Sequence, residues 1–492
     1  MTSTTILGVV IGYLLILLAI GFWGGRESSD LKGYYVAGKK LPSWVIAFSS
    51  NATGESAWLL LGLTGMGYAI GVHAFWIIMG EVLGVACAWV LVARPFKEYT
   101  DRCDAITVPD YLTERFFDKS NAFRWLSAVI ILSMVVAYTA AQLTASGKAF
   151  DSFLGTGYTQ GVWIGLAIVL FYTTVGGFKA VAYSDFLQGV LMLGCLLMLP
   201  IVGIANAGGW GDMIANLRAQ DPALLEPMGV YGLSLAGVIS AAGSVAIGLA
   251  FLGSPQLLTR FMAARDQKQI VDGGFWAVLC VIGFDVGAVF GGMAGRSLFP
   301  GLADPETILP AMSAALFPAF FTGIFLVVVL AAIMSTLDSL LILASSVVVR
   351  DVVQKSLGSS ASERMLSMMG KGVTAVIGSV GLVVALLEVR VIFDFVLFAW
   401  SGIACAFTPV VLCSLYWKRT TREGAIAGMI GGFATTVIWV RVFKEGFYEL
   451  YEMIPGFAAG LLLCVVVSLV TKPDDGAVAE LESVRDTVGP VF

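Results

Sequence analysis

Long apolar runs recur along nearly the whole chain and are separated by short polar stretches. A helix needs roughly 20 apolar residues to cross a hydrocarbon core about 30 Å thick. We predict thirteen membrane-spanning helices of about this length, at 5–24, 43–70, 73–93, 123–150, 159–177, 182–204, 230–253, 271–294, 311–346, 372–388, 393–416, 424–442 and 451–471. The pattern predicts an all-α polytopic membrane protein with a single transmembrane transporter domain, 1–492.

Two of these runs, the second and the seventh, are interrupted. The second contains the polar stretch 49–56, and the seventh contains Gly243, Gly248 and Gly253 before Pro255. Broken helices at corresponding places of two halves are typical of transporters built from inverted repeats, with the binding site near the midplane. We therefore expect an extra N-terminal helix, two repeats, two C-terminal helices and a tail, at 5–24, 43–204, 230–416, 424–471 and 472–492.

Composition agrees with a lipid environment. Apolar residues make up 58% of the chain and charged residues 13%, against about 45–50% and 25% in soluble domains. Six of the seven cysteines lie in apolar runs, so neither a disulfide framework nor a metal cluster is indicated. With no Ser/His pair or phosphate loop in a suitable context, we expect a protein that is not an enzyme and has no cofactor beyond a coupling ion.

The basic residues are distributed unequally between alternate loops. If the predicted helices are numbered along the chain, 23 of the 29 Lys and Arg residues fall on one side. The positive-inside rule makes that side cytoplasmic. This orientation places the N-terminus outside and the C-terminus in the cytoplasm, in a cell (inner or plasma) membrane.

The polar stretch 49–56 would lie at mid-membrane depth. Unsatisfied backbone groups cost several kcal/mol there, so an unwound stretch must face protein or a water-filled cavity. Unwinding would offer carbonyl oxygens to a cation and a half-helix N-terminus to a carboxylate. The alternative is a helix kinked at Gly54 whose hydroxyls bond to their own backbone. Glu55 favours the functional reading, because an ionisable group at this depth is expensive.

The ninth run carries a second set of candidate ligands. Ala332, Ser335 and Thr336 are spaced i, i+3 and i+4 and therefore share one helix face. Two hydroxyls, a carbonyl one turn earlier and carbonyls from the second run would give neutral oxygens suited to sodium. The alternative is the ordinary role of Ser and Thr in packing membrane helices.

Five further acidic residues fall within apolar runs: Glu81, Asp185, Asp285, Asp338 and Asp394. Each could be paired structurally, line a water path or carry a proton. Asp185 and Asp338 are the leading ion-path or coupling candidates.

Several longer motifs identify a family resemblance. They are the stretch 172–181 continuing to Asp185 and Gln188, the stretch 255–264 and the stretch 331–336. With these motifs the chain resembles the sodium/solute symporter family over nearly its whole length, and within it most closely the bacterial sodium/proline symporters. The resemblance implies a fold like that of the leucine transporter, with one extra N-terminal helix before two inverted five-helix repeats.

The resemblance also implies binding residues. A sodium ion would be held by the carbonyls of Ala52, Glu55 and Ala332 and by the hydroxyls of Ser335 and Thr336. The solute would contact positions that lie in the second, fourth and seventh runs: Ser56, Trp58, Tyr138, Ile247, Phe251 and Pro255.

At three positions the chain departs from the proline-transporter pattern. Ile247 stands where those transporters have tryptophan, and Phe251 stands where they have tyrosine. Gly54 replaces an acid, with Glu55 one position later. A pocket that loses an indole N–H and a phenol O–H loses hydrogen bonds that discriminate between substrates.

Together these features predict a sodium-coupled secondary symporter that imports a small organic solute by alternating access, with proline as the best candidate. Its expected partners are the solute, sodium and the lipid bilayer, and no nucleic acid. Alternatives are another amino acid or small carboxylate as solute, or proton coupling through Glu55 or Asp338. A transporter-like membrane sensor is an alternative of a different class, although the tail after Lys472 is short for a signalling domain.

Overall fold

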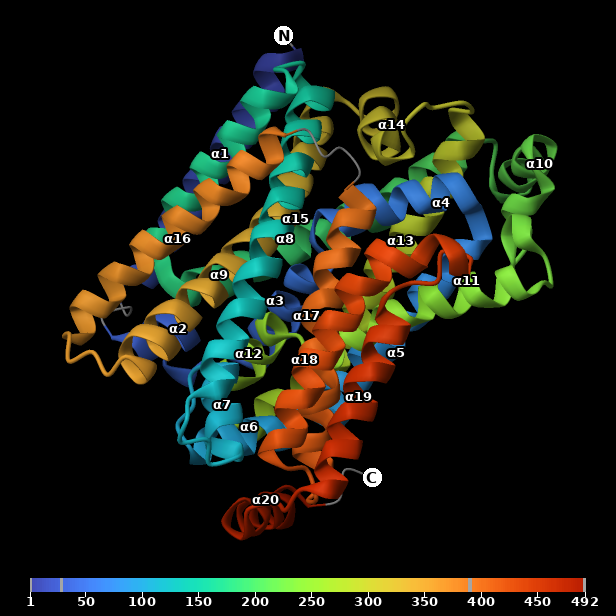
Figure 1. Cartoon of the computed structure of the whole chain (residues 1–492). Coiled ribbons are helices and arrows are strands. Elements are labelled where there is room, and N and C mark those ends of the chain that lie inside the picture. The colour runs from blue at the N-terminus through green and yellow to red at the C-terminus, as the bar shows by residue number, and fades with distance from the viewer. Residues whose placement is uncertain (1, 27–29, 388–391, 490–492) are drawn as a thin grey trace.

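The chain is almost entirely helical in the computed structural model, which describes residues 2–26, 30–387 and 392–489. Long helices lie side by side around α3, α12 and α17 (Figure 1). In the described part the strand-like pairing is limited to an isolated bridge between Leu41 and Ala264.

The bundle is built from α1 (Thr2–Gly25), α3 (Ser43–Ala57), α4 (Thr64–Ile70), α5 (Phe75–Cys87), α8 (Ala122–Leu154), α9 (Tyr158–Asn206), α11 (Leu235–Ala246), α12 (Pro255–Ala263), α13 (Gln267–Leu298), α15 (Ala319–Ser346), α16 (Glu363–Leu386), α17 (Ile392–Tyr416), α18 (Arg422–Ile438) and α19 (Met453–Val470). Further helices border the bundle: α2 (Leu31–Val36), α6 (Ala93–Arg102), α7 (Val108–Arg115), α10 (Trp210–Gln220), α14 (Ile308–Leu316) and α20 (Asp475–Val488). Distorted turns join or extend them: η2 (Trp58–Leu63), η4 (Ala88–Val92), η7 (Ile247–Leu252), η9 (Val347–Ser356) and η10 (Trp439–Phe443).

Eleven helical stretches of the described residues are long and apolar enough to cross a membrane. Two of them, Ser43–Arg102 with 60 residues and α9 with 49 residues, are longer than one crossing needs. Each is interrupted at a glycine with positive φ, Gly71 at 56° and Gly177 at 62°, close to predicted segment boundaries. The multi-pass helical architecture is confirmed, and the count of thirteen crossings stays a prediction.

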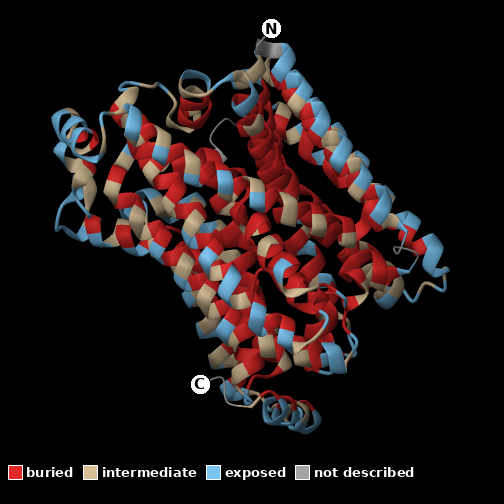
Figure 2. Ribbon diagram, turned by 180° about the vertical axis from the view of Figure 1, so that it is seen from behind, coloured by how far each residue is buried: buried red, intermediate tan, exposed pale blue. Residues whose placement is uncertain are grey.

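Burial separates central helices from peripheral ones. In the most apolar 18-residue stretch of each helix, 83% of the residues are buried in α15 and 89% in α17. Only 28% are buried in the corresponding stretches of α1 and α19. The outward faces of the peripheral helices carry exposed apolar side chains, such as Leu15, Val129 and Ile201, and exposed residues mark the rim of the bundle (Figure 2). Such a surface is suited to lipid, so α15 and α17 form the core against which a site can be built.

The predicted interruption of the seventh run is confirmed. α11 ends at Ala246, the 3-10 turn η7 follows, and α12 starts at Pro255 after the non-helical residue Gly253. A proline at the first position of a helix loses no hydrogen bond, because that N–H has no helical partner. The chain therefore breaks here in the middle of the bundle.

Glycines bring α5 into backbone contact with η7. A Cβ atom added to Gly248 would lie 1.8 Å from the carbonyl oxygen of Gly80, and one added to Gly84 would lie 2.1 Å from the carbonyl oxygen of Gly248. No side chain fits in either place. These contacts hold α5, which carries Glu81, directly against the broken seventh segment.

The two ends of the bundle differ. α2, α6, α7 and α20 gather at one end, α10 and α14 lie at the other, and the two termini are at opposite ends (Figure 1). We call the end with α6, α7 and α20 the basic end. There Arg102 Nη1 donates to Ser483 Oγ of α20 at 2.7 Å, and Lys418 pairs with Glu482 at 2.9 Å.

α7 packs into the protein at the basic end. The Thr107 side chain caps the N–H of Asp110, and Val108 and Leu112 are fully buried. The side chain of Asp394, residue 388 of the tenth predicted segment and residues 490–492 of the tail lie outside the described residues.

The α5–η7 contact generates a stability prediction. Gly248→Ala places a methyl group on the Gly80 backbone, and overpacking of this kind costs about 1–3 kcal/mol or more. The thermal midpoint of the purified protein in detergent should fall by several degrees. Gly194→Ala is the matched control, because nothing lies within 4 Å of its added Cβ, and an unchanged midpoint in both variants would contradict the contact.

Candidate functional site

The break in α3 is narrower than the sequence predicted. The expected unwinding over 49–56 is wrong: residues 49–55 are helical, and the helix departs from regular geometry at Ser56, with φ 54° and ψ −170°. A regular turn satisfies its own backbone groups, which matters most where water is absent. The polar side chains of this stretch instead bond to other helices, as Asn51 Nδ2 does to the carbonyl oxygen of Ala277 at 2.7 Å.

Ser56 is held in a conformation that a non-glycine residue rarely adopts. Such a conformation costs of the order of 1–3 kcal/mol and tends to be kept at functional sites. Two side-chain oxygens satisfy the N–H groups that follow: Ala57 N–H donates to Gln142 Oε1 at 3.2 Å, and Trp58 N–H donates to Ser56 Oγ at 3.1 Å. The second half of the broken helix thus begins with N–H groups bound to side chains.

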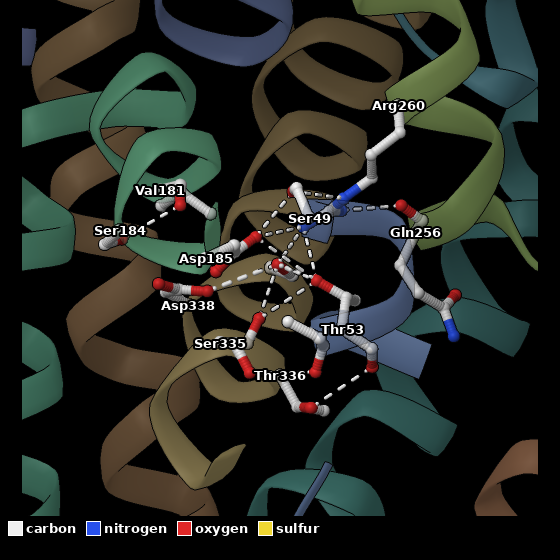
Figure 3. Close-up of polar contacts among 12 residues, drawn as sticks. Ser49, Thr53, Val181, Ser184, Asp185, Gln256, Arg260, Ser335, Thr336 and Asp338 are labelled. Atoms are coloured by element: carbon white, nitrogen blue, oxygen red, sulfur yellow. Dashed lines mark hydrogen bonds and ion pairs between the residues drawn. The ribbon is translucent and has the colours of Figure 1, made fainter. Parts of the chain in front are cut away.

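Hydroxyl groups of α15 lie against the carbonyl groups of α3 just before this break. Ser335 Oγ is 2.9 Å from the carbonyl oxygen of Ala52 and 3.1 Å from that of Ala332. Thr336 Oγ1 is 3.1 Å from the carbonyl oxygen of Thr53 (Figure 3). All five residues are buried, so oxygens from two helices converge without access to water in this conformation.

The structure brings together four of the five predicted sodium ligands: Ala52, Ala332, Ser335 and Thr336. The carbonyl of the fifth, Glu55, accepts the Trp58 N–H. The Thr53 carbonyl was not predicted, although it lies between two residues that were. The donor set is chemically suited to sodium, since neutral carbonyl and hydroxyl oxygens near a half-helix end are the groups that coordinate this ion in such folds.

A buried arginine lies next to these oxygens. Arg260 of α12 is 1% exposed, and its Nη2 contacts Asp185 Oδ2 at 3.1 Å and Thr53 Oγ1 at 2.6 Å. Its Nε donates to Ser49 Oγ at 3.2 Å, and that hydroxyl donates to Asp185 at 2.6 Å (Figure 3). Arg260 is one of the 23 basic residues that the loop pattern assigned to the cytoplasmic side, so its burial beside Asp185 was not predicted.

Asp338 completes this polar cluster on α15. Its Oδ2 accepts from the Tyr172 hydroxyl at 2.5 Å, and its Oδ1 accepts from Ser339 Oγ at 3.2 Å. Ser339 also accepts a hydrogen bond from Arg260. Asp185 and Asp338, the two predicted ion-path candidates, therefore belong to one network around Arg260. This network joins α3, α9, α12 and α15 beside the Ser335 and Thr336 hydroxyls.

Three of the six predicted solute positions contact an aromatic side chain of α17 that was not predicted. Trp400 lies 6.5 Å from Tyr138 and 5.4 Å from Phe251 between ring centroids, and its Nε1 donates to the carbonyl oxygen of Ile247 at 3.3 Å. Ser56, Trp58 and Pro255 are also buried, at the two helix breaks. The sequence pattern did not indicate a role for Trp400, because the apolar run 393–416 that contains it has no polar interruption.

Gly54, next to the break in α3, lies against the break of the seventh segment. A Cβ atom at this position would lie 2.8 Å from Phe251 Cε1. Phe251 thus occupies the space that an acidic side chain at position 54 would need. The two departures from the proline-transporter pattern, at 54 and at 251, therefore lie against each other.

A cavity opens beyond the break, away from the basic end. It has a volume of about 730 Å³ and is lined by residues of η2, α4, α8 and the segment before α14, among them Gly62, Gly65, Lys148, Asp304 and Glu306. Lys148 pairs with both acids, at 3.1 Å from Asp304. The cavity is large enough for a small solute and begins one turn after Trp58.

Known proteins of similar sequence are transporters. The chain is 37% identical to the high-affinity proline transporter PutP of Bacillus subtilis over 482 residues, which cover 96% of this chain and 100% of the relative. It is 34% identical to the osmoregulated proline transporter OpuE of the same organism, with 94% of each chain covered. It is also 34% identical to a sodium/proline symporter of Staphylococcus aureus, with 97% of this chain and 95% of the relative covered.

Solved structures support the same fold. A Na⁺-coupled sialic acid symporter in a substrate-bound outward-open state superposes with a TM-score of 0.82 at 18% identity, covering 95% of this chain and 98% of the other. A nucleobase-cation-symport-1 family transporter superposes with a TM-score of 0.57 at 13% identity, covering 94% and 96%. The family model described as "Sodium:solute symporter family" matches residues 34–432. The chain belongs to the sodium:solute symporter family.

Proposed function

We propose that this protein is a sodium-coupled symporter that imports proline or a closely similar small solute. The observation that carries the proposal is the contact between the Ser335 and Thr336 hydroxyls of α15 and the Ala52 and Thr53 carbonyls of α3. Family membership and the names of the relatives support sodium as the coupling ion and proline as the solute.

In the proposed sodium site the ion binds between α3 and α15. Its ligands are the oxygens of Ala52, Glu55, Ala332, Ser335 and Thr336. The ion would replace the direct hydrogen bond of Ser335 to Ala52, so that the hydroxyl oxygen and both carbonyls face one positive charge. Binding then ties the two helices together and favours one arrangement of the repeats, 43–204 and 230–416, over the other.

In the proposed solute site the carboxylate of the solute binds at the break of α3. The Ala57 and Trp58 N–H groups donate there to side-chain oxygens of Gln142 and Ser56. A solute carboxylate can replace these oxygens as the acceptor, so the number of hydrogen bonds stays about the same. The aromatic faces of Tyr138 and Trp400 can hold a secondary ammonium by a cation–π interaction. Apolar Ile247 and Phe251 suit a small hydrocarbon ring, with Pro255 at the second break.

The membrane potential can drive accumulation of the solute inside the cell. With the basic end in the cytoplasm, as we propose, sodium enters with the inside-negative potential. One charge crossing 100 mV contributes about 2.3 kcal/mol. Since 1.4 kcal/mol is a factor of ten, this supports a solute ratio of roughly fifty before the sodium gradient is added.

The direct test is uptake of labelled proline into vesicles that contain the purified protein. An inward sodium gradient should drive accumulation, an equal potassium gradient should not, and unlabelled proline should compete better than other amino acids and small carboxylates. Equal uptake in potassium would contradict sodium coupling. Competition that favours another solute would leave the coupling in place and reject proline.

Removal of one hydroxyl should weaken sodium binding selectively. Thr336→Ala removes an oxygen that lies 3.1 Å from the Thr53 carbonyl, so half-maximal uptake should need about tenfold more sodium, while the maximal rate changes much less. Ser379→Ala is the control, because its hydroxyl only bonds to its own helix at Ala375. A Thr336→Ala protein with unchanged sodium dependence would show that the ion binds elsewhere.

The buried ion pair should be needed for both folding and transport. Asp185→Asn leaves the Arg260 guanidinium without its carboxylate partner, which costs about 3–5 kcal/mol. We expect a lower thermal midpoint and at least about tenfold slower uptake. Joining Asp185→Asn with Arg260→Gln should restore much of the midpoint but not the uptake. Arg265→Gln is the control, since that side chain is exposed beside Asp266, and normal uptake by the Asp185→Asn protein would refute the role of the pair.

A further inference from the structure

Three acidic side chains meet on the face of α3 that the proposed sodium site does not use. They come from three helices, Glu55 from α3, Glu81 from α5 and Asp285 from α13, and are exposed by 0%, 3% and 0%. One carboxylate oxygen of each lies within 4.8 Å of the others. We call these residues the acidic triad.

The oxygens of the acidic triad are not satisfied by the protein. Five of the six are buried without a hydrogen-bond partner: both of Glu55, both of Asp285 and Oε2 of Glu81. The other titratable groups that face the triad are the Cys280 thiol and the Tyr138 hydroxyl. In the described part of the chain no basic side chain pairs with it.

A neutral oxygen is directed to the same place. Asn51 lies one turn before Glu55 on the same face of α3, and its Nδ2 is fixed to the Ala277 carbonyl of α13. Its Oδ1 is fully buried and has no hydrogen-bond partner. Cys280 lies beside the Asn51 amide and close to both Glu55 and Asp285. An unused amide oxygen therefore adds to the unpartnered carboxylate oxygens.

The repulsion between the carboxylates of the acidic triad must be offset by a cation or by bound protons. Two carboxylates 4.8 Å apart repel by about 3.5 kcal/mol at an effective dielectric constant of 20, and a third adds to this. A cation midway between two such oxygens would be about 2.4 Å from each, within the range for Ca²⁺, which is close to Na⁺ in size. Glu81 is close enough to Glu55 and to Asp285 for protonated carboxyl groups to share hydrogen bonds when no cation is bound, whereas as carboxylates these oxygens have no donor.

We propose that Glu55, Glu81, Asp285 and the Asn51 amide oxygen form a second cation site, which binds one sodium ion. Glu55 contributes to both proposed sites, with its carbonyl oxygen to the first and its carboxylate, beside those of α5 and α13, to the second. The proposal extends the sodium coupling proposed above and gives two sodium ions for each solute.

The test is equilibrium binding of ²²Na⁺ to the purified full-length protein in nanodiscs, without any solute. The wild type should bind about two ions. Glu81→Gln and Asp285→Asn should each bind about one ion, because each variant removes a carboxylate from the acidic triad. Ser335→Ala should also bind about one ion, held by the triad.

Glu452→Gln is the control for removal of a buried acid, because Glu452 pairs with Lys444 at 3.1 Å, outside both sites. The ion retained at Ser335 and Thr336 reports that each triad variant is folded. Undiminished binding in Glu81→Gln and Asp285→Asn would overturn the second site. Loss of the only bound ion in Ser335→Ala would do the same while leaving the proposed function intact. Two bound ions without sodium-driven uptake would instead reject the proposed function.

Discussion

The polar break of α3 must be satisfied by protein, because lipid offers no hydrogen bonds. Three other helices supply what is needed: α8 contributes Gln142 to the Ala57 N–H, α15 contributes Ser335 and Thr336 to the carbonyls before the break, and α12 contributes Arg260 to the Thr53 hydroxyl. Each of these bonds joins α3 to another helix. A ligand that replaces one of them changes how two helices are held.

The two faces of α3 carry opposite electrostatic arrangements. On the face toward α9, α12 and α15, the Arg260 guanidinium pairs with Asp185, and Tyr172 donates to Asp338. On the face toward α5 and α13, three carboxylates converge without a cationic side chain among the described residues. Polar networks that are incompletely satisfied in a low dielectric are costly. A cation from outside the protein would offset the charge of the second face, whereas the first face already contains a guanidinium.

Patterns that repeat along the chain were predictable, and contacts between distant segments were not. The broken second and seventh runs and the shared face of Ala332, Ser335 and Thr336 followed from polarity and helical spacing. The narrowing of the α3 break to Ser56 depends on partners such as Ala277, more than 200 residues away. The charge pattern assigned Arg260 to a cytoplasmic loop, and nothing distinguished Trp400 from other aromatic residues in apolar runs. Their roles arise from the packing of α12 and α17 into the core.

Thermal stability tests sodium binding to the oxygens between α3 and α15 without knowledge of the solute. A ligand that binds only the folded state stabilises it by RT ln(1 + [L]/Kd). The thermal midpoint of the wild type should therefore rise steadily as sodium chloride replaces potassium chloride at constant ionic strength. In the Ser335→Ala/Thr336→Ala protein this rise should be much smaller. An equal rise in both proteins, or none in the wild type, would show that sodium does not bind between α3 and α15.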